Sequence, residues 1–209
     1  MLFYGIELLR DLGCDRVIII LGGNSVGDIV NLVRDGSAFG VEVVYKFQNE
    51  PKGISHAIKL VEDIIKDNFL VLLGDNLFEN IDSLKKGIKY WFKGSGLLFL
   101  TESQNPHAYG QPFMVNGVIE RFVEKDPMID HNLIIPGLYG LSTDCFEVIR
   151  NQNPSSRGEY EITDTLTSYL PGNLTVSDYE GFWSDCGTPE GLAEATQHFM
   201  KEAQNVIHS

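Results

Sequence analysis

Phe69-Leu-Val-Leu-Leu-Gly-Asp75-Asn76 is the stretch around which the chain is organised. Its run of apolar residues predicts a central strand of a parallel sheet, buried on both faces. Gly74 ends the strand, and a carboxylate and an amide follow at its C-terminal end, the edge at which open α/β sheets bind ligands. An Asp at that point can hold a hard divalent cation, although Gly-Asp-Asn is also a common turn sequence. This stretch alone leaves both interpretations open.

Composition and charge narrow the class of protein. With 209 residues, 43% hydrophobic and 22% charged, the chain is expected to form a single domain over residues 1–209. A net charge of −13 argues against a nucleic-acid polymer or an anionic membrane as a partner. The three cysteines are far apart in the sequence, at Cys14, Cys145 and Cys186, which is typical of reduced thiols and not of a disulfide framework. The sequence shows neither a signal peptide nor an apolar run long enough to span a membrane. We therefore expect a cytoplasmic protein.

Strands and helices alternate in the first half of the chain. The apolar patterns predict strands over 17–21, 41–47, 69–73 and 96–101, and helices over 2–12, 25–34, 54–66 and 81–91. Such alternation implies right-handed crossovers and a largely parallel sheet between layers of helices.

The second half of the chain has a different character. The patterns predict a hairpin around Asn116-Gly117, strands over 133–141 and 174–179, and helices over 142–150, 159–170 and 188–207. The last of these helices keeps five apolar residues on one face, namely Leu192, Ala195, Phe199, Ala203 and Val206. We therefore expect a mixed sheet with a small antiparallel insertion.

A first candidate binding loop runs from Gln48 to Gly53. A Gln amide offers both a donor and an acceptor, which suits the edge of a nucleotide base. A Gly at a helix start lets a flat ring approach the backbone. An ordinary Pro-Gly turn is the alternative explanation.

A second candidate site combines Tyr109-Gly110 with Glu124-Lys125. A Glu can accept hydrogen bonds from sugar hydroxyls, while the adjacent Lys can meet a phosphate. Neighbours on a strand point to opposite faces, so both can act together only if the strand ends or bulges there. Asp126-Pro127, which follows directly, favours the end of the strand at this point. The alternative interpretation is that Glu124 and Lys125 form an exposed ion pair.

Asp185 is the candidate partner of Asp75. It lies in Trp183-Ser-Asp-Cys-Gly-Thr188, just before a predicted helix, where a lone Asp often serves only as a cap. Two Asp residues from separate strand ends, however, form a minimal cage for Mg²⁺ that keeps water and phosphate ligands. We expect Asp75 and Asp185 to lie at the same edge of the sheet.

Taken together, the motifs resemble those of the sugar-phosphate nucleotidyltransferases, and the resemblance runs in order along nearly the whole chain. They are Asp35-Gly-Ser-Ala-Phe-Gly40, Tyr45-Lys-Phe-Gln48-Asn-Glu-Pro-Lys-Gly53-Ile-Ser-His-Ala57, Leu73-Gly-Asp75-Asn76, Tyr109-Gly110, Glu124-Lys125, Pro136-Gly-Leu-Tyr139, Arg157-Gly-Glu-Tyr-Glu-Ile-Thr-Asp164 and Trp183-Ser-Asp185-Cys-Gly-Thr188.

The resemblance implies a Rossmann-like α/β/α sandwich with a mixed, mostly parallel central sheet. It also implies transfer of a nucleoside monophosphate from an NTP, dTTP being favoured, to a sugar-1-phosphate, glucose-1-phosphate being favoured. Oligomers are common in the family, so the resemblance allows a homo-oligomer of this chain. Each matching residue takes a role from the family: Gln48, Gly53 and Asp75 in nucleotide binding, Tyr109, Gly110, Glu124 and Lys125 in sugar-phosphate binding, Asp75 and Asp185 in Mg²⁺ binding, and Lys125 and Asp75 in catalysis.

The family pattern also includes an opening segment, a Gly-rich loop of the form G-G-x-G-T-R-L and a later Lys, which holds the triphosphate. Met1-Leu-Phe-Tyr4 matches the residues just after that Lys, so the resemblance implies that this segment is missing here. The expectation that follows is little or no pyrophosphorylase activity of this chain alone. The alternative is a relative that binds nucleotide and sugar phosphate without catalysis.

Overall fold

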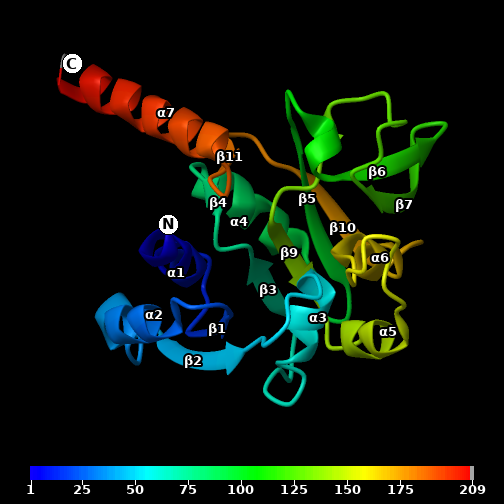
Figure 1. The fold of residues 1–209 in the computed structure, drawn as a ribbon. Helices are drawn as coiled ribbons and strands as arrows, with labels where there is room; N and C mark the ends of the chain where they lie inside the picture. The colour runs from blue at the N-terminus through cyan, green and yellow to red at the C-terminus, as the bar shows by residue number, and fades with distance from the viewer. Residues whose placement is uncertain (208–209) are drawn as a thin grey trace.

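The structure, a computed structural model, describes residues 1–207 as an α/β fold around a five-stranded sheet (Figure 1). The helices are α1 (Leu2–Asp11), α2 (Val26–Val33), α3 (Ile54–Lys59), α4 (Ile81–Tyr90), α5 (Cys145–Asn151), α6 (Ile162–Thr167) and α7 (Pro189–Ile207), with 3-10 turns η1 (Ser37–Phe39) and η2 (Pro106–Ala108). The strands are β1 (Arg16–Leu21), β2 (Glu42–Phe47), β3 (Phe69–Leu72), β4 (Asn76–Phe78), β5 (Gly96–Glu102), β6 (Gly110–Val115), β7 (Val118–Glu124), β8 (Leu133–Ile134), β9 (Leu138–Leu141), β10 (Leu174–Asp178) and β11 (Trp183–Asp185).

The central sheet has the strand order β10-β5-β9-β3, and β8 pairs with the end of β5. β10 is parallel to β5, while β9 is antiparallel to both β5 and β3. Consequently β10, β5 and β3 run in one direction and β9 runs against them. This is the mixed, mostly parallel sheet that the sequence predicts.

Helices cover both faces of this sheet, and β5 shows how. Leu97 and Phe99 belong to a core cluster with residues of α1 and α4, whereas Leu98 and Leu100 belong to a second cluster with residues of α3, α5 and α6. Successive strand residues point to opposite faces, so the two clusters lie on the two sides of the sheet. The predicted α/β/α sandwich is confirmed.

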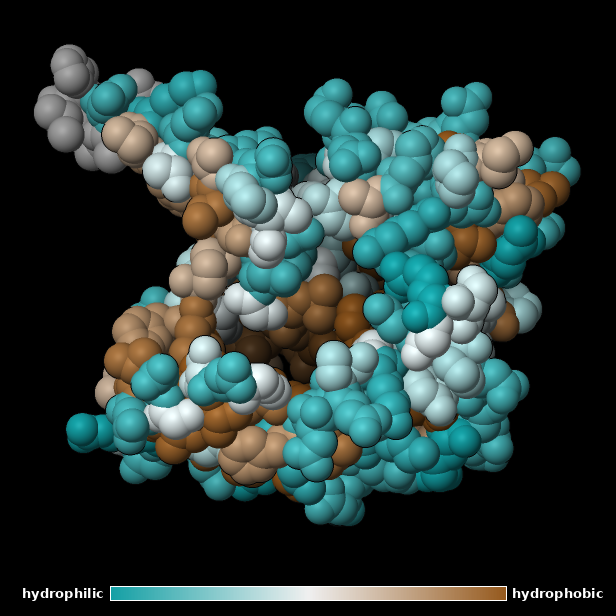
Figure 2. Space-filling model, viewed as in Figure 1, coloured by the Kyte–Doolittle hydropathy of each residue, from teal (hydrophilic) through white to brown (hydrophobic). Residues whose placement is uncertain are grey.

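The position of β3 corrects one prediction. Its residues, Phe69–Leu72, are only half-buried, and β3 pairs with β9 alone, so it is an edge strand of the central sheet. β1 and β2 form a separate parallel pair. Figure 2 shows a hollow with an apolar floor in the region that β3 occupies in Figure 1. The central strands are β5, buried over its first five residues, and β9, buried throughout, because each has neighbours on both edges.

The antiparallel insertion is the hairpin β6–β7. Asn116 and Gly117 both have positive φ angles, 52° and 77°, as the predicted two-residue turn requires. The predicted strand 133–141 is divided into β8 and β9, because the segment around Pro136 leaves the ladder. A short antiparallel pair, β4 with β11, was not predicted.

Three helices differ from their predicted form. α3 ends at Lys59 and continues only as turns, and α6 begins at Ile162, so Glu159 and Glu161 precede it. α7 extends away from the body of the molecule in Figure 1, and its predicted apolar face is only partly covered. Ala195 is buried, whereas Leu192 and Phe199 are 52% and 38% exposed. The side chains of Ala203 and Val206 lie outside the described residues. In the described part of the chain, no helix has the length and apolar character needed to cross a bilayer.

Candidate active site

A cavity of about 190 Å³ lies where several strand ends meet. We call it the central cavity. Its lining is drawn from the ends of β3 and β9, the start of β4, the facing ends of β6 and β7, the segment 157–163 and β11. The lining includes Ile54, Leu73, Asp75, Asn76, Ala108, Tyr109, Gly110, Glu124, Lys125, Ile135, Gly137, Tyr139, Arg157, Glu159, Glu161, Ile162, Thr163, Trp183 and Asp185.

Asp75 and Asp185 face the same small space in this cavity. The β4–β11 pairing places Asp185 opposite Asn76, and the Cys186 N–H donates to the Asp75 carbonyl at 2.8 Å. A Cβ on Gly187 would lie 2.6 Å from Asp75 Oδ2 and 3.0 Å from Asp185 Oδ1. The two carboxylates are therefore neighbours, as predicted, although they are far apart in the sequence.

The donor set fits Mg²⁺. Carboxylate oxygens are hard ligands, and Mg²⁺ usually binds through one or two carboxylates while it keeps waters and phosphate oxygens. Within residues 1–207, no group of three or more His, Cys, Asp or Glu side chains is arranged to hold a metal. A cation held by Asp75 and Asp185 would accordingly complete its shell with water and substrate, and this role remains a prediction.

Asn76 holds Asp75 in place. It is only 5% exposed, and its Nδ2 donates to Asp75 Oδ1 at 2.9 Å. Its Oδ1 accepts hydrogen bonds from Gly137 N at 2.9 Å and from Trp183 Nε1 at 2.8 Å. Both of those partners can only donate, so the orientation of the amide is fixed. The ring of Trp183 also meets Tyr109 edge-on, with centroids 5.1 Å apart.

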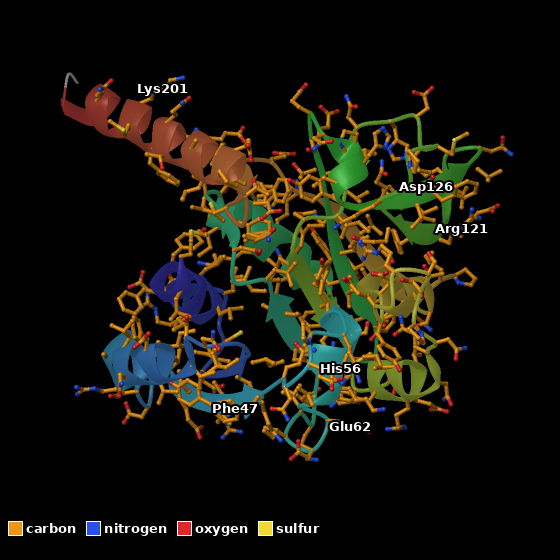
Figure 3. All side chains as sticks on the ribbon, in the orientation of Figure 1. Phe47, His56, Glu62, Arg121, Asp126 and Lys201 are labelled. Atoms are coloured by element: carbon orange, nitrogen blue, oxygen red, sulfur yellow. The ribbon has the colours of Figure 1, made fainter. Side chains whose placement is uncertain are left out.

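Glu124 and Lys125 both line the cavity because β7 ends between them. Lys125 has a φ of 52°, in the left-handed region, and its N–H donates to the Tyr109 carbonyl at 3.0 Å. The backbone reversal breaks the alternation of a strand, as the sequence argument required. Asp126, labelled in Figure 3, follows immediately. Gly110 pairs with Glu124, and a Cβ there would lie 3.2 Å from Glu124 Oε2.

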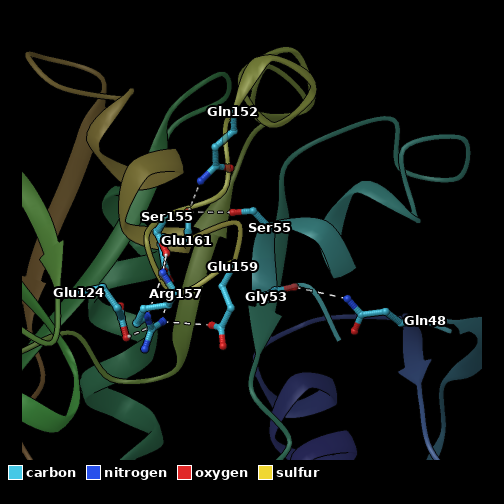
Figure 4. A network of polar contacts seen from close by, with 9 residues as sticks. All are labelled: Gln48, Gly53, Ser55, Glu124, Gln152, Ser155, Arg157, Glu159 and Glu161. Carbon is cyan, nitrogen blue, oxygen red and sulfur yellow. Dashed lines mark hydrogen bonds and ion pairs between the residues drawn. The ribbon is translucent and has the colours of Figure 1, made fainter. Parts of the chain in front are cut away.

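Arg157 organises a group of carboxylates beside Glu124 (Figure 4). It donates to both oxygens of Glu161, at 3.0 and 2.8 Å, and to Glu159 at 3.0 Å, and it lies 4.0 Å from Glu124. Burial raises the pKa of Glu124, and the nearby Glu161 raises it further, while Arg157 and Lys125 oppose the shift. No role was predicted for Arg157, although its place in Arg-Gly-Glu-Tyr-Glu puts a cation among carboxylates in the sequence.

Gln48 lies outside the lining of the central cavity. It is half-buried, and its amide reaches Gly53 and His56 instead. Gly53 has a φ of 98°, and a Cβ there would lie 2.6 Å from the Tyr160 carbonyl oxygen. The Gln48–Gly53 loop is therefore joined to the segment that carries Glu159 and Glu161, at one wall of the cavity.

Comparison with known proteins gives one consistent family. The model of the family described as nucleotidyl transferase matches residues 1–202. The low-salt glycan biosynthesis nucleotidyltransferase Agl11 of Haloferax volcanii is 34% identical over 97% of this chain and 58% of its own length. A glucose-1-phosphate thymidylyltransferase of Streptomyces antibioticus is 27% identical over 98% of this chain and 58% of its own length. The chain thus spans less than two thirds of these two relatives.

A solved structure shares the fold. It is a protein described as a glucose-1-phosphate thymidylyltransferase from Bacillus anthracis, in complex with sucrose. The TM-score is 0.83 and the sequence identity is 30%, over 93% of this chain and 80% of the other.

Proposed function

Because the chain belongs to the nucleotidyl transferase family, we propose that it transfers a nucleoside monophosphate from an NTP to a sugar-1-phosphate, with release of pyrophosphate. The observation that carries this proposal is the convergence of Asp75, Asp185, Glu124 and Lys125 on one cavity. dTTP and glucose-1-phosphate are the favoured substrates, because two similar proteins bear the name glucose-1-phosphate thymidylyltransferase.

In the proposed reaction, an oxygen of the sugar phosphate attacks the α-phosphorus of the NTP in line with the leaving pyrophosphate. A new P–O bond forms as the bond from the α-phosphorus to the bridging oxygen breaks, so no covalent enzyme intermediate is needed. Lys125 would hold the attacking phosphate, and Glu124 would accept hydrogen bonds from sugar hydroxyls. Gly110 and Tyr109 would lie against the sugar.

Mg²⁺ is the proposed cofactor, held by Asp75 and Asp185. When bound, it would offset negative charge on the phosphates. The negative charge of the cavity supports the proposal that a cation accompanies the phosphates. Its lining carries five carboxylates, Asp75, Glu124, Glu159, Glu161 and Asp185, against the two cations Lys125 and Arg157. Arg157 is already bonded to Glu161, so a triphosphate would meet a largely negative wall.

The proposal is tested by pyrophosphate release from dTTP and glucose-1-phosphate in the presence of Mg²⁺. Any pyrophosphate release by the wild-type protein, which is expected to be slow, should require both substrates. Asp75→Asn, Asp185→Asn and Lys125→Met should each lower the rate by about 10²-fold or more, since each removes a charge placed at the reacting phosphates. Asp178→Asn is a matched control, because Asp178 is exposed and lies outside the cavity lining.

Calorimetry with each substrate separates the two functions considered. Binding of both substrates without pyrophosphate release would favour the alternative, a relative that binds nucleotide and sugar phosphate without transfer. If the protein bound neither dTTP nor glucose-1-phosphate, both functions would be contradicted.

A further inference from the structure

The amide of Gln48 is held by two contacts from one short segment. Its Nε2 lies 3.4 Å from the Gly53 carbonyl oxygen and 2.8 Å from His56 Nδ1. Gly53 precedes α3 and His56 is its third residue, so a single turn of helix positions both partners. Figure 4 shows the Gln48 carbonyl oxygen directed away from Gly53.

The Gly53 contact decides which way the amide faces. A backbone carbonyl oxygen can only accept, so the NH₂ group of Gln48, and not its oxygen, belongs on that side. One N–H then points at Gly53 and the other at His56 Nδ1. Consequently His56 Nδ1 is the acceptor, and the ring proton is on Nε2.

The ring of His56 has its own support. It stacks on Tyr160, with ring centroids 6.1 Å apart and an interplanar angle of 29°. Tyr160 is in turn bonded through its backbone to Lys52 and Ser55. The acceptor nitrogen is thus held by the same segment that forms one wall of the central cavity. Figure 3 labels His56 on α3.

We propose that His56 is a positioning residue that makes Gln48 select pyrimidine bases that carry a proton on ring atom N3. This inference rests on the proposed function, in which Gln48 contacts the base. With both of its N–H groups engaged by the protein, Gln48 presents only its carbonyl oxygen. Uracil and thymine offer N3–H to that oxygen, whereas N3 of cytosine is a bare acceptor and is repelled by it.

The test compares dUTP with dCTP, since these nucleotides differ only at N3 and at the substituent on C4 of the base. Wild-type protein with Mg²⁺ should bind dUTP about tenfold or more tightly than dCTP, as measured by calorimetry. His56→Phe keeps a ring that can stack on Tyr160 but removes the acceptor, so one Gln48 N–H is released and the amide can turn. The ratio of the two affinities should fall by about tenfold, the scale of one hydrogen bond.

Two further variants give the test its controls. His56→Asn offers Oδ1 as an acceptor near the position of Nδ1, and it should restore most of the preference for dUTP. Lys59→Gln changes an exposed residue on the same helix and should leave the preference unchanged. A purely structural role of His56 would weaken dUTP and dCTP binding by the same factor, with no change in the ratio.

Nitrogen NMR of the wild-type protein provides a measurement without substitution. The His56 ring should show the Nε2–H tautomer at pH 8. An Nδ1–H tautomer would mean that His56 donates to Gln48, and this would overturn the proposed orientation.

The outcomes distinguish the inference from the function on which it rests. If wild-type protein binds dUTP and the ratio is unchanged in His56→Phe, the inference is wrong and the proposed function stands. If wild-type protein binds neither nucleotide, both are wrong. Should His56→Phe not fold, two other results can still refute the inference. One is a loss of the dUTP preference in His56→Asn, and the other is an Nδ1–H tautomer of His56 in the wild-type protein.

Discussion

Gly187 shows how a single missing side chain makes room for a ligand. The space that its Cβ would fill is bounded by Asp75 Oδ2 at 2.6 Å and Asp185 Oδ1 at 3.0 Å. Real side chains almost never approach an oxygen as closely as the first of these distances, so any larger residue must displace a carboxylate. The vacant space is therefore part of the site that we propose for Mg²⁺.

Gly187→Ala should weaken binding of a divalent cation by about tenfold or more, as displacement of supporting groups at metal sites does. Mn²⁺ can replace Mg²⁺ as the probe, with its free concentration followed by electron paramagnetic resonance. Gly74→Ala is the matched control, because Gly74 adjoins Asp75 and a Cβ there would meet no atom within 4 Å. Equal Mn²⁺ affinities in wild type and Gly187→Ala would contradict the assignment of the site.

Glu124 lowers the free energy of unfolding by an amount that depends on pH. Its folded-state pKa is raised above the ordinary value of 4.5 by burial and by Glu161. The folded protein therefore binds more protons than the unfolded chain between 4.5 and the raised value, and the free energy of unfolding falls as pH rises through that interval. At neutral pH the ionised carboxylate is destabilising, which suits a residue kept for binding and not for stability.

Glu124→Gln should accordingly raise the melting temperature at pH 7.5, and the gain should disappear as the pH is lowered to about 4.5. Thermal unfolding at a series of pH values measures this difference. Glu120→Gln, an exposed position on the same strand, should show no such pH-dependent gain. A gain for Glu124→Gln that is constant with pH would rule out the electrostatic explanation.

At the scale of elements, β3 is an edge strand of the central sheet, with β9 as its one partner strand. The Leu73 N–H donates to the Gly137 carbonyl at 2.8 Å, on the side of β9. Amides alternate in direction along a strand, so Val71 also points to β9, whereas Leu70 and Leu72 point to the opposite edge. In the described part of the chain, β3 pairs with β9 alone, so no strand lies along this opposite edge.

Hydrogen exchange should therefore divide β3 by alternate residues. We expect the amides of Leu70 and Leu72 to exchange faster than those of Val71 and Leu73, by about tenfold or more, because exchange at an open edge needs no disruption of the ladder. Two-dimensional NMR after transfer to deuterated water measures all four amides in one experiment. Equal protection at the four positions would show that another backbone segment pairs with this edge.

At the scale of the whole molecule, the candidate metal site joins two distant parts of the chain. Asp75 follows β3, while Asp185 ends β11, four residues before the start of α7 at Pro189. A ligand held by both is lost on unfolding, so it should stabilise the fold by mass action. The net charge of −13 adds to this expectation, because a bound cation reduces repulsion within the chain.

Mg²⁺ at 100 times its dissociation constant should add about 2.7 kcal/mol to the free energy of unfolding, and EDTA should reverse the effect. Urea unfolding with Mg²⁺ and with EDTA measures this difference. It should be lost in Asp185→Asn and retained in Asp178→Asn. If Asp185→Asn responded to Mg²⁺ as fully as wild type, the stabilising ion would have to bind elsewhere.

The sequence by itself determined the kinds of element and the positions of the functional groups along the chain. The hairpin around Asn116-Gly117, the presence of the apolar strands β3 and β5 and the position of Asp75 just after a strand all follow from local patterns. These features depend on the alternation of side chains and on turn chemistry, which neighbouring residues decide. The order of the motifs also indicated the family to which the chain belongs.

Only the tertiary structure decided which strand is central and how the polar groups meet. The apolar runs of β3 and β5 are alike in sequence, yet β5 has partners on both edges and β3 has one, because pairing depends on distant residues. The joint presence of Glu124 and Lys125 in the cavity depends on the φ of 52° at Lys125. The carboxylates around Arg157 and the contact of Gln48 with His56 likewise require side-chain directions, which the order of residues does not contain.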